Sequence, residues 1–233
     1  MNSSAQIKKN IEKINFRIDN AAKVSSRKQE DITLVSVTKS FPNAIWNTAI
    51  KNNLFTIAEN RINETEEKYL HCKQRNKLKL HLIGHLQSNK AKNAIKMFDV
   101  IETVDSIKLA SKLNKEAYQK EKIQTIYVQI NTGKDPNKFG FDVDRVLEKI
   151  ILISQMKNLK LKGIMTIPPR FVSEIQLRNI FKKTREIRDN VYNNVDSFCK
   201  DLSMGMSNDF DIAIEEGATH VRIGTAIFGN RPK

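Results

Sequence analysis

The sequence predicts an α/β protein whose strands and helices close into a parallel TIM-type (β/α)8 barrel with an extra N-terminal helix. Eight short apolar runs suited to buried strands recur along the 233 residues, and a segment of helix length separates each from the next. Such alternation favours a parallel sheet. Polar and glycine residues also collect directly after the runs, and functional sites of barrels lie at the carboxyl ends of the strands.

The extra helix is expected over residues 4–22, where isoleucines and alanines recur at helical spacing behind Ser3 and Ser4. Two later segments show the same spacing, one starting at Ile107 and one starting at Val143. The strands are expected at residues 32–37, 54–58, 79–83, 99–104, 123–131, 160–167, 199–203 and 219–223.

One domain is expected over residues 1–233, because no Pro/Gly/Ser-rich linker, low-complexity tract or repeat divides the chain. An open, doubly wound sheet would show the same alternation. No GxGxxG motif follows the first strand, so the usual dinucleotide fingerprint is absent. The barrel is therefore the preferred prediction.

The composition predicts a soluble cytoplasmic protein. No apolar run approaches the roughly 18 residues of a membrane span, and the charged N-terminus does not have the apolar stretch of a signal peptide. Two distant cysteines, Cys72 and Cys199, are too few for a disulfide framework. A net charge of +14 raises the alternative of nucleic-acid binding, but the basic residues are spread along the chain, which favours a solvated basic surface.

Two glycine-bearing loops predict a phosphate site. The seventh strand ends in Leu202–Ser207 and the eighth in Val221–Thr225. Such loops offer backbone N–H groups and hydroxyls, which a phosphate monoester requires, and barrels commonly bind phosphate after these two strands. The candidate phosphate ligands are Ser203, Ser207, Gly224 and Thr225.

A single lysine, Lys39, follows the first apolar strand. In a closed barrel the first strand neighbours the eighth, so Lys39 is expected beside the phosphate site. A phosphate cradle with a nearby lysine suits an aldehyde cofactor such as pyridoxal 5'-phosphate (PLP). No spacing of histidines suggests a metal site.

The chain also resembles the pyridoxal phosphate homeostasis proteins, a family similar in fold to the N-terminal barrel of alanine racemase, the type III fold of PLP proteins. The resemblance extends along nearly the whole chain, and its most specific parts are HLIGHLQSNK and LSMGMS followed by RIGTAIFG. The segments that carry it are Val35–Lys39, Glu59–Asn60, His81–Lys90, Lys162–Met165, Leu202–Ser207 and Val221–Gly229.

The resemblance implies roles for three residues. Lys39 matches the lysine that forms a Schiff base with PLP. Arg222 matches an arginine that faces the pyridine nitrogen, where a permanent donor leaves the nitrogen unprotonated and limits the ring as an electron sink. Asn60 is placed near the phenolic oxygen. The family usually has Gly-Glu-Asn where this chain has Ala58-Glu59-Asn60, which leaves open whether that loop is rearranged.

The function expected from these observations is noncatalytic: a monomeric carrier that buffers PLP and supplies it to PLP-dependent acceptor enzymes. The alternative is a PLP-dependent amino-acid racemase on the same barrel. In alanine racemase a second acid/base group comes from an additional domain of the partner subunit, and this sequence, which ends at Lys233, is expected to have no such domain. A basic nucleic-acid-binding protein is a third alternative; no specific nucleic acid and no membrane partner is expected.

Overall fold

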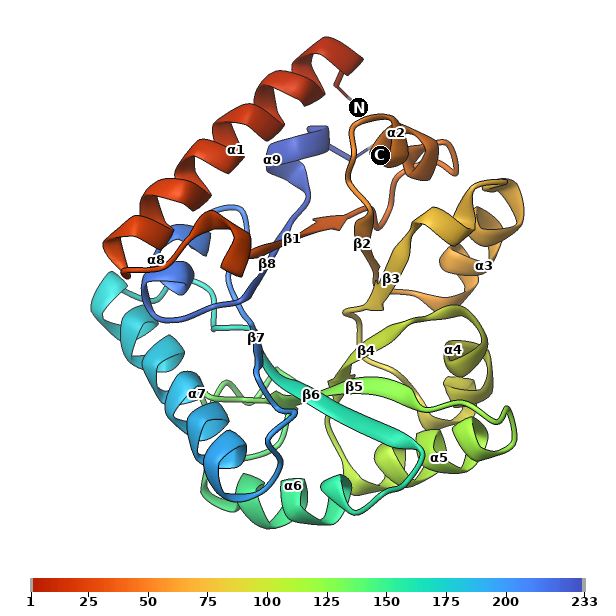
Figure 1. The fold of residues 1–233 in the computed structure, drawn as a ribbon, viewed down its shortest axis with the longest axis vertical. Coiled ribbons are helices and arrows are strands. Elements are labelled where there is room, and N and C mark those ends of the chain that lie inside the picture. Colours follow the sequence, from red (N-terminus) through yellow and green to blue (C-terminus); the bar gives the residue numbers. More distant parts are fainter. Residues whose placement is uncertain (1, 232–233) are drawn as a thin grey trace.

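The computed structural model describes residues 2–231 and contains a closed barrel of parallel strands, in the order β1 to β8 (Figure 1). Every predicted strand is present, which confirms the fold class. The strands are β1 Thr33–Val37, β2 Thr56–Glu59, β3 Lys79–Leu82, β4 Val100–Val104, β5 Gln124–Ile130, β6 Leu159–Thr166, β7 Asp201–Ser203 and β8 His220–Ile223.

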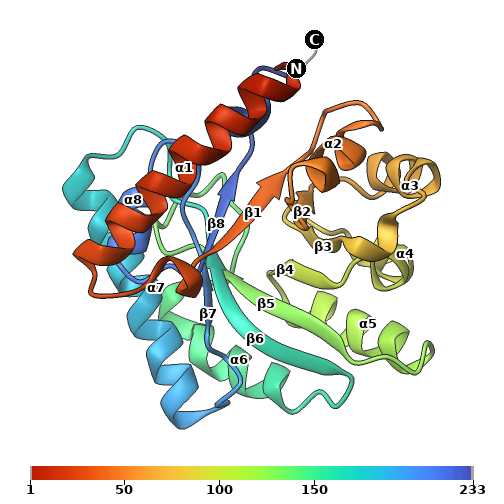
Figure 2. The same cartoon turned by 45° about the horizontal axis from the view of Figure 1, so that its top comes forward.

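Helices form the outer ring of the barrel, and the predicted N-terminal helix α1 packs outside it against α8 and α9 (Figures 1 and 2). Ser3 caps α1, since its hydroxyl accepts a hydrogen bond from the backbone N–H of Gln6. The helices are α1 Ser4–Val24, α2 Ile45–Lys51, α3 Ile62–His71, α4 Ala91–Met97, α5 Ile107–Tyr118, α6 Val146–Ser154, α7 Glu174–Asn194, α8 Phe210–Glu215 and α9 Thr225–Phe228.

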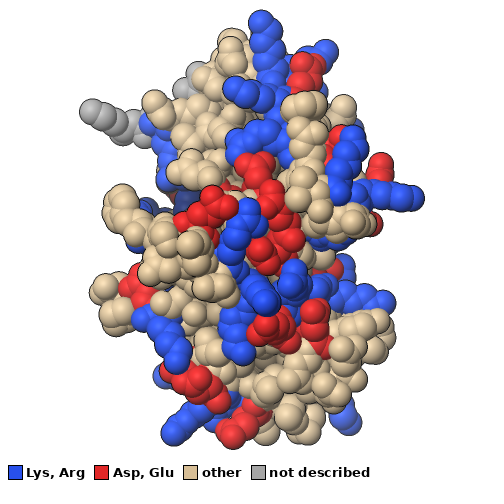
Figure 3. All heavy atoms as spheres, turned by 90° about the vertical axis from the view of Figure 1, so that its left-hand side faces the viewer, with Lys and Arg blue, Asp and Glu red and all other residues tan. Residues whose placement is uncertain are grey.

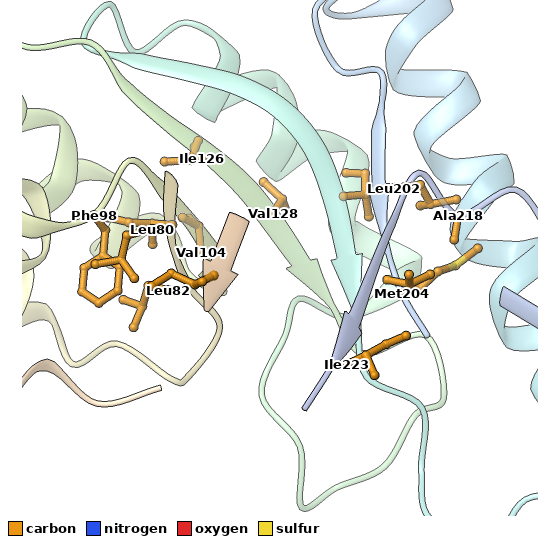
Figure 4. Packing of buried hydrophobic residues seen from close by; sticks show 14 of the residues in the cluster. Leu80, Leu82, Phe98, Val104, Ile126, Val128, Leu202, Met204, Ala218 and Ile223 are labelled. Carbon is orange, nitrogen blue, oxygen red and sulfur yellow. The ribbon is translucent and has the colours of Figure 1, made fainter. Parts of the chain in front are cut away.

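The main hydrophobic core lies between the barrel and its helices. Strand residues that face outward, such as Leu80, Ile126 and Leu202, pack with residues of the connecting loops such as Phe98 and Ala218 (Figure 4). These strands are apolar on the outer face because helices cover them completely, as is usual for parallel sheets.

The inside of the barrel is partly polar. Towards the amino ends of the strands, the Tyr127 hydroxyl donates to Asp201 at 2.7 Å and lies 3.3 Å from Nε2 of His220. Burial lowers the pKa of His220 to about 4, although the nearby Asp201 carboxylate opposes this shift. His220 is therefore a neutral core histidine.

The surface shows mixed charge on the face formed by α1, α7 and α8, where acidic side chains gather among lysines and arginines (Figure 3). Arg178 contacts Glu174, Glu215 and Glu216 there. Within residues 2–231, none of the helices combines the length and the apolar character needed to cross a membrane.

The burial of His220 predicts that the protein becomes less stable in acid. Its folded pKa of about 4 lies below the ordinary 6.5, so the unfolded chain binds the extra proton first as the pH falls. Neutral His220 therefore contributes to the free energy of unfolding in full above pH 6.5. This contribution, about 3 kcal/mol, is lost as the pH falls from 6.5 towards 4. Urea unfolding at several pH values should show a smaller loss over this range for His220→Gln than for the wild type. Equal pH dependence of the two proteins would contradict the assignment.

Candidate cofactor site

A cavity of about 780 Å³ opens at the carboxyl ends of the strands, between the loops that follow β1, β6, β7 and β8. It brings together most of the residues predicted from the sequence. Its lining includes the predicted residues Lys39, Ser207, Arg222, Gly224 and Thr225.

Lys39 lies in the turn after β1, and it reaches the cavity because β1 pairs with β8. Burial is the main cause that lowers the pKa of its amine, and the positive charges of Arg231 and Arg222 add to it. Glu59 and Glu64 act in the opposite direction. The net shift raises the share of neutral amine, which is the nucleophilic form.

The two glycine-bearing loops form a cradle of hydrogen-bond donors. Among the residues that the structure describes, the backbone N–H groups of Ser207, Gly224 and Thr225 have no acceptor. A Cβ at position 224 would lie 2.9 Å from the carbonyl oxygen of Val37, so the loop can lie this close to β1 only with glycine. Free N–H groups and the hydroxyls of Ser207 and Thr225 suit a phosphate monoester.

Ser207 does not cap the following helix. Asp209 occupies the N-cap position of α8, and its carboxylate accepts a hydrogen bond from the Met206 N–H at 2.5 Å. Ser207 instead lines the cavity, and its hydroxyl makes no hydrogen bond to the described part of the chain.

Arg222 is buried on β8, and its guanidinium is held from two sides. It donates to the Ser203 hydroxyl at 2.7 Å and to the Thr166 carbonyl at 2.9 Å. Burial lowers its pKa, while the charges of Glu102 and Asp209 raise it. An arginine remains charged under these conditions. It therefore presents a fixed, permanent donor to the cavity.

Ser203 lies beneath the cavity and is absent from its lining. Its buried hydroxyl donates to Glu102 at 2.6 Å and accepts from Arg222. Glu102 also contacts Nδ1 of His81 at 2.6 Å. Burial would raise the pKa of Glu102, but its pairing with His81 and the charge of Arg222 outweigh burial and lower it to about 2. In these contacts Ser203 supports Arg222, and a phosphate contact for Ser203 stays a prediction.

Asn60 also lies outside the cavity lining, although β2 ends directly before it. Its backbone packs against Gly84, where an added Cβ would lie 2.1 Å from the Asn60 carbonyl oxygen. The Asn60 Oδ1 is buried and has no hydrogen-bond partner among the described residues. Ala58 is an ordinary strand residue paired with Val37 and His81, so alanine causes no rearrangement there. A place for Asn60 beside a cofactor stays a prediction from the resemblance.

Sequence reasoning missed several residues of the site. Lys138 lines the cavity and donates to the Pro168 carbonyl at 2.6 Å, and Asp209 shapes the loop after β7. Glu102 had a visible signal, since a lone carboxylate within the apolar run of β4 requires a buried partner. His81 is a core histidine bonded to that carboxylate.

Comparisons with known proteins identify the family. The family model described as alanine racemase, N-terminal domain, matches residues 5–232. The pyridoxal phosphate homeostasis protein of Aquifex aeolicus is 34% identical over 92% of this chain and 94% of its own length. The Escherichia coli K12 protein of the same name is 31% identical and covers 95% of both chains. The chain belongs to the pyridoxal phosphate homeostasis protein family.

Solved structures agree with membership of this family. PipY of Synechococcus elongatus PCC7942, solved with PLP bound, is 30% identical, with a TM-score of 0.81 over 91% of this chain and all of its own. The same protein without PLP is 32% identical, with a TM-score of 0.82 over 85% of this chain and 93% of its own. An alanine racemase of Clostridium difficile, 19% identical with a TM-score of 0.71 over 98% of this chain and 58% of its own, shares the fold.

Two serines of the site should differ in their effect on stability. Ser203→Ala removes the partner of both Arg222 and Glu102, and a buried group left unsatisfied costs about 1–3 kcal/mol. Ser207→Ala is the matched control and should change the free energy of unfolding by less than about 0.5 kcal/mol. Urea unfolding of both variants measures the difference. Equal effects would show that the hydrogen bonds of Ser203 with Arg222 and Glu102 contribute nothing measurable to stability.

Proposed function

We propose that the protein binds PLP in this cavity and acts as a noncatalytic carrier that buffers the cofactor. The observation that carries the proposal is the convergence of an amine with a lowered pKa and a set of unpartnered N–H donors in one cavity. An aldehyde that bears a phosphate monoester matches both features. The names of the relatives and the PLP bound in PipY support the same ligand.

Each part of the site has a role in this proposal. Lys39 is the attachment point for the aldehyde, and the donors of Ser207, Gly224 and Thr225 hold the phosphate. Arg222 faces the pyridine ring. Bound PLP supplies an aldehyde that reacts with amines and a ring that can accept electrons. Because Arg222 has only donors to offer, it cannot protonate the ring nitrogen as an acid would, and this limits the chemistry of the held cofactor.

The carrier is favoured over the racemase by the residues around the cavity. Two-base racemisation needs a second acid/base group on the face opposite the lysine. Among the described lining residues there is no tyrosine, histidine or cysteine. The Asp209 carboxylate accepts the Met206 N–H, and Lys138 donates to a carbonyl, so both are engaged elsewhere. The proposal includes a cytoplasmic, monomeric carrier that supplies PLP-dependent acceptor enzymes.

The attachment point can be tested with two lysines of the same cavity. Lys39 and Lys138 both line it, and burial lowers the pKa of both amines. After incubation with PLP and reduction by borohydride, peptide mass mapping should find the adduct on Lys39 in the wild type and in Lys138→Ala. Lys39→Ala should lose it.

The comparison of the two lysine variants also shows which result would rule out Lys39 as the attachment point. An adduct that persists in Lys39→Ala at the wild-type yield, or that maps to Lys138, would place the anchor elsewhere. Inorganic phosphate should compete with PLP if the donor cradle holds the phosphate group.

A second measurement separates carrier from racemase. The PLP-loaded protein is expected to give no sustained conversion of L-alanine to D-alanine, because no second base faces Lys39. Chiral chromatography over many enzyme equivalents measures this. Turnover that is lost in Lys39→Ala would establish the racemase instead.

A further inference from the structure

A buried ionic cluster lies directly behind Lys39. Its central group is the amine of Lys68 on α3, whose side chain is fully buried. The amine donates to the Thr38 carbonyl and to Glu59 Oε1, each at 2.8 Å, and to Glu64 Oε1 at 2.7 Å. A buried ammonium is costly unless all its protons are used, and here each has an acceptor. We call these three residues, Glu59, Glu64 and Lys68, the Lys68 cluster.

The Lys68 cluster forms hydrogen bonds to the residues directly before and directly after Lys39. Before it, the Thr38 carbonyl accepts from Lys68, and the Thr38 hydroxyl donates to Glu59 at 2.6 Å. After it, the backbone N–H of Ser40 donates to Glu64. Ser40 has a φ of +61°, a left-handed conformation that costs energy for a residue other than glycine and needs support from its surroundings. The turn that carries Lys39 is therefore defined by contacts to α3 and to the last residue of β2.

The same carboxylates act on the charge of Lys39. Glu59 and Glu64 raise the pKa of its amine, against burial and the two arginines that lower it. Lys68 partly neutralises both carboxylates through direct contacts. A change in the net charge of the cluster should therefore change the ratio of charged to neutral amine at Lys39, even where the fold is kept.

We propose that Lys68 is a positioning residue for Lys39. Together with Glu59 and Glu64 it fixes the Lys39 turn and holds two carboxylates close to the Lys39 amine. The importance of this for PLP rests on the proposed function, since Glu59, Glu64 and Lys68 do not themselves line the cavity. A purely structural cluster would alter stability without altering the acid–base behaviour of Lys39.

The decisive measurement uses the cofactor-free protein. Competitive acetylation with acetic anhydride across a pH range, read by mass spectrometry of the Lys39 peptide, reports the apparent pKa of that amine. Glu64→Gln keeps an acceptor for Ser40 but removes the charge, and Glu64 is partly exposed, so the fold should persist. The labelling profile of Lys39 should move to lower pH. Burial already raises the pKa of Glu59, so in Lys68→Met alone Glu59 would take up a proton and hide the effect. On the Glu59→Gln background, Lys68→Met leaves Glu64 without its compensating charge, and the profile should move to higher pH than in Glu59→Gln alone.

PLP binding gives a second reading of the same variants. Lys68→Met removes the donor to the Thr38 carbonyl and loosens the turn, so PLP should bind about tenfold more weakly, which corresponds to about 1.4 kcal/mol. Lys68→Arg should recover part of this loss. If Lys68→Met does not fold, PLP binding is compared between Glu59→Gln and Lys68→Met combined with Glu59→Gln, which removes both charges of the buried pair.

Lys122→Met provides the matched control. Lys122 is also a partly buried lysine whose amine donates to two carbonyls, those of Ile95 and Phe98, at the far side of α4. Lys122→Met should lower the stability of the protein and leave the labelling profile of Lys39 unchanged. Unmoved profiles in both Glu64→Gln and the Lys68 variants would overturn the proposal. Failure of wild-type protein to bind PLP would reject the proposed function alone, because the labelling experiment contains no cofactor.

Discussion

The pairing of β1 with β8 is the constraint on which the rest of the site depends. Residues Thr33–Ser36 lie beside His220–Ile223, and this contact closes the barrel. It brings Lys39 close to Arg222 and to the loop at Gly224, which are distant from Lys39 in the sequence. Without closure, an amine and a phosphate cradle would lie at two separate edges of an open sheet. The tight approach at Val37 explains why glycine occupies position 224.

Buried charge inside the barrel positions the polar groups that face the cavity. Arg222 is held through Ser203 by Glu102, and Glu102 is held by His81. A hydrophobic interior would be at least as stable, since desolvating such ions costs several kcal/mol each. The arrangement gives Arg222 a single orientation instead. This is the kind of support that a binding group needs if it is to be in place before the ligand arrives.

The sequence predicted the elements well and the interior of the barrel poorly. Apolar runs and glycine loops depend on local composition, so the strands and the cavity residues Lys39 and Ser207 could be placed from them. The contacts of Ser203 could not, because whether a strand residue faces inward, and at what height, depends on register. Register shifts occur in β4 after Ile101 and in β6 after Leu161, and they change which residues meet. Composition likewise does not show that the backbone of Asn60 packs against Gly84, outside the lining of the cavity.

A carrier must both hold its ligand and give it up, and the electrostatics around Lys39 suit that requirement. Burial and two arginines favour the neutral amine, which attaches an aldehyde, whereas two carboxylates behind the turn favour the charged amine, which does not. Because these effects oppose one another, a change in the charge of either carboxylate would shift the share of neutral amine at Lys39. The position of the carboxylates behind Lys39 is therefore itself an argument for reversible holding.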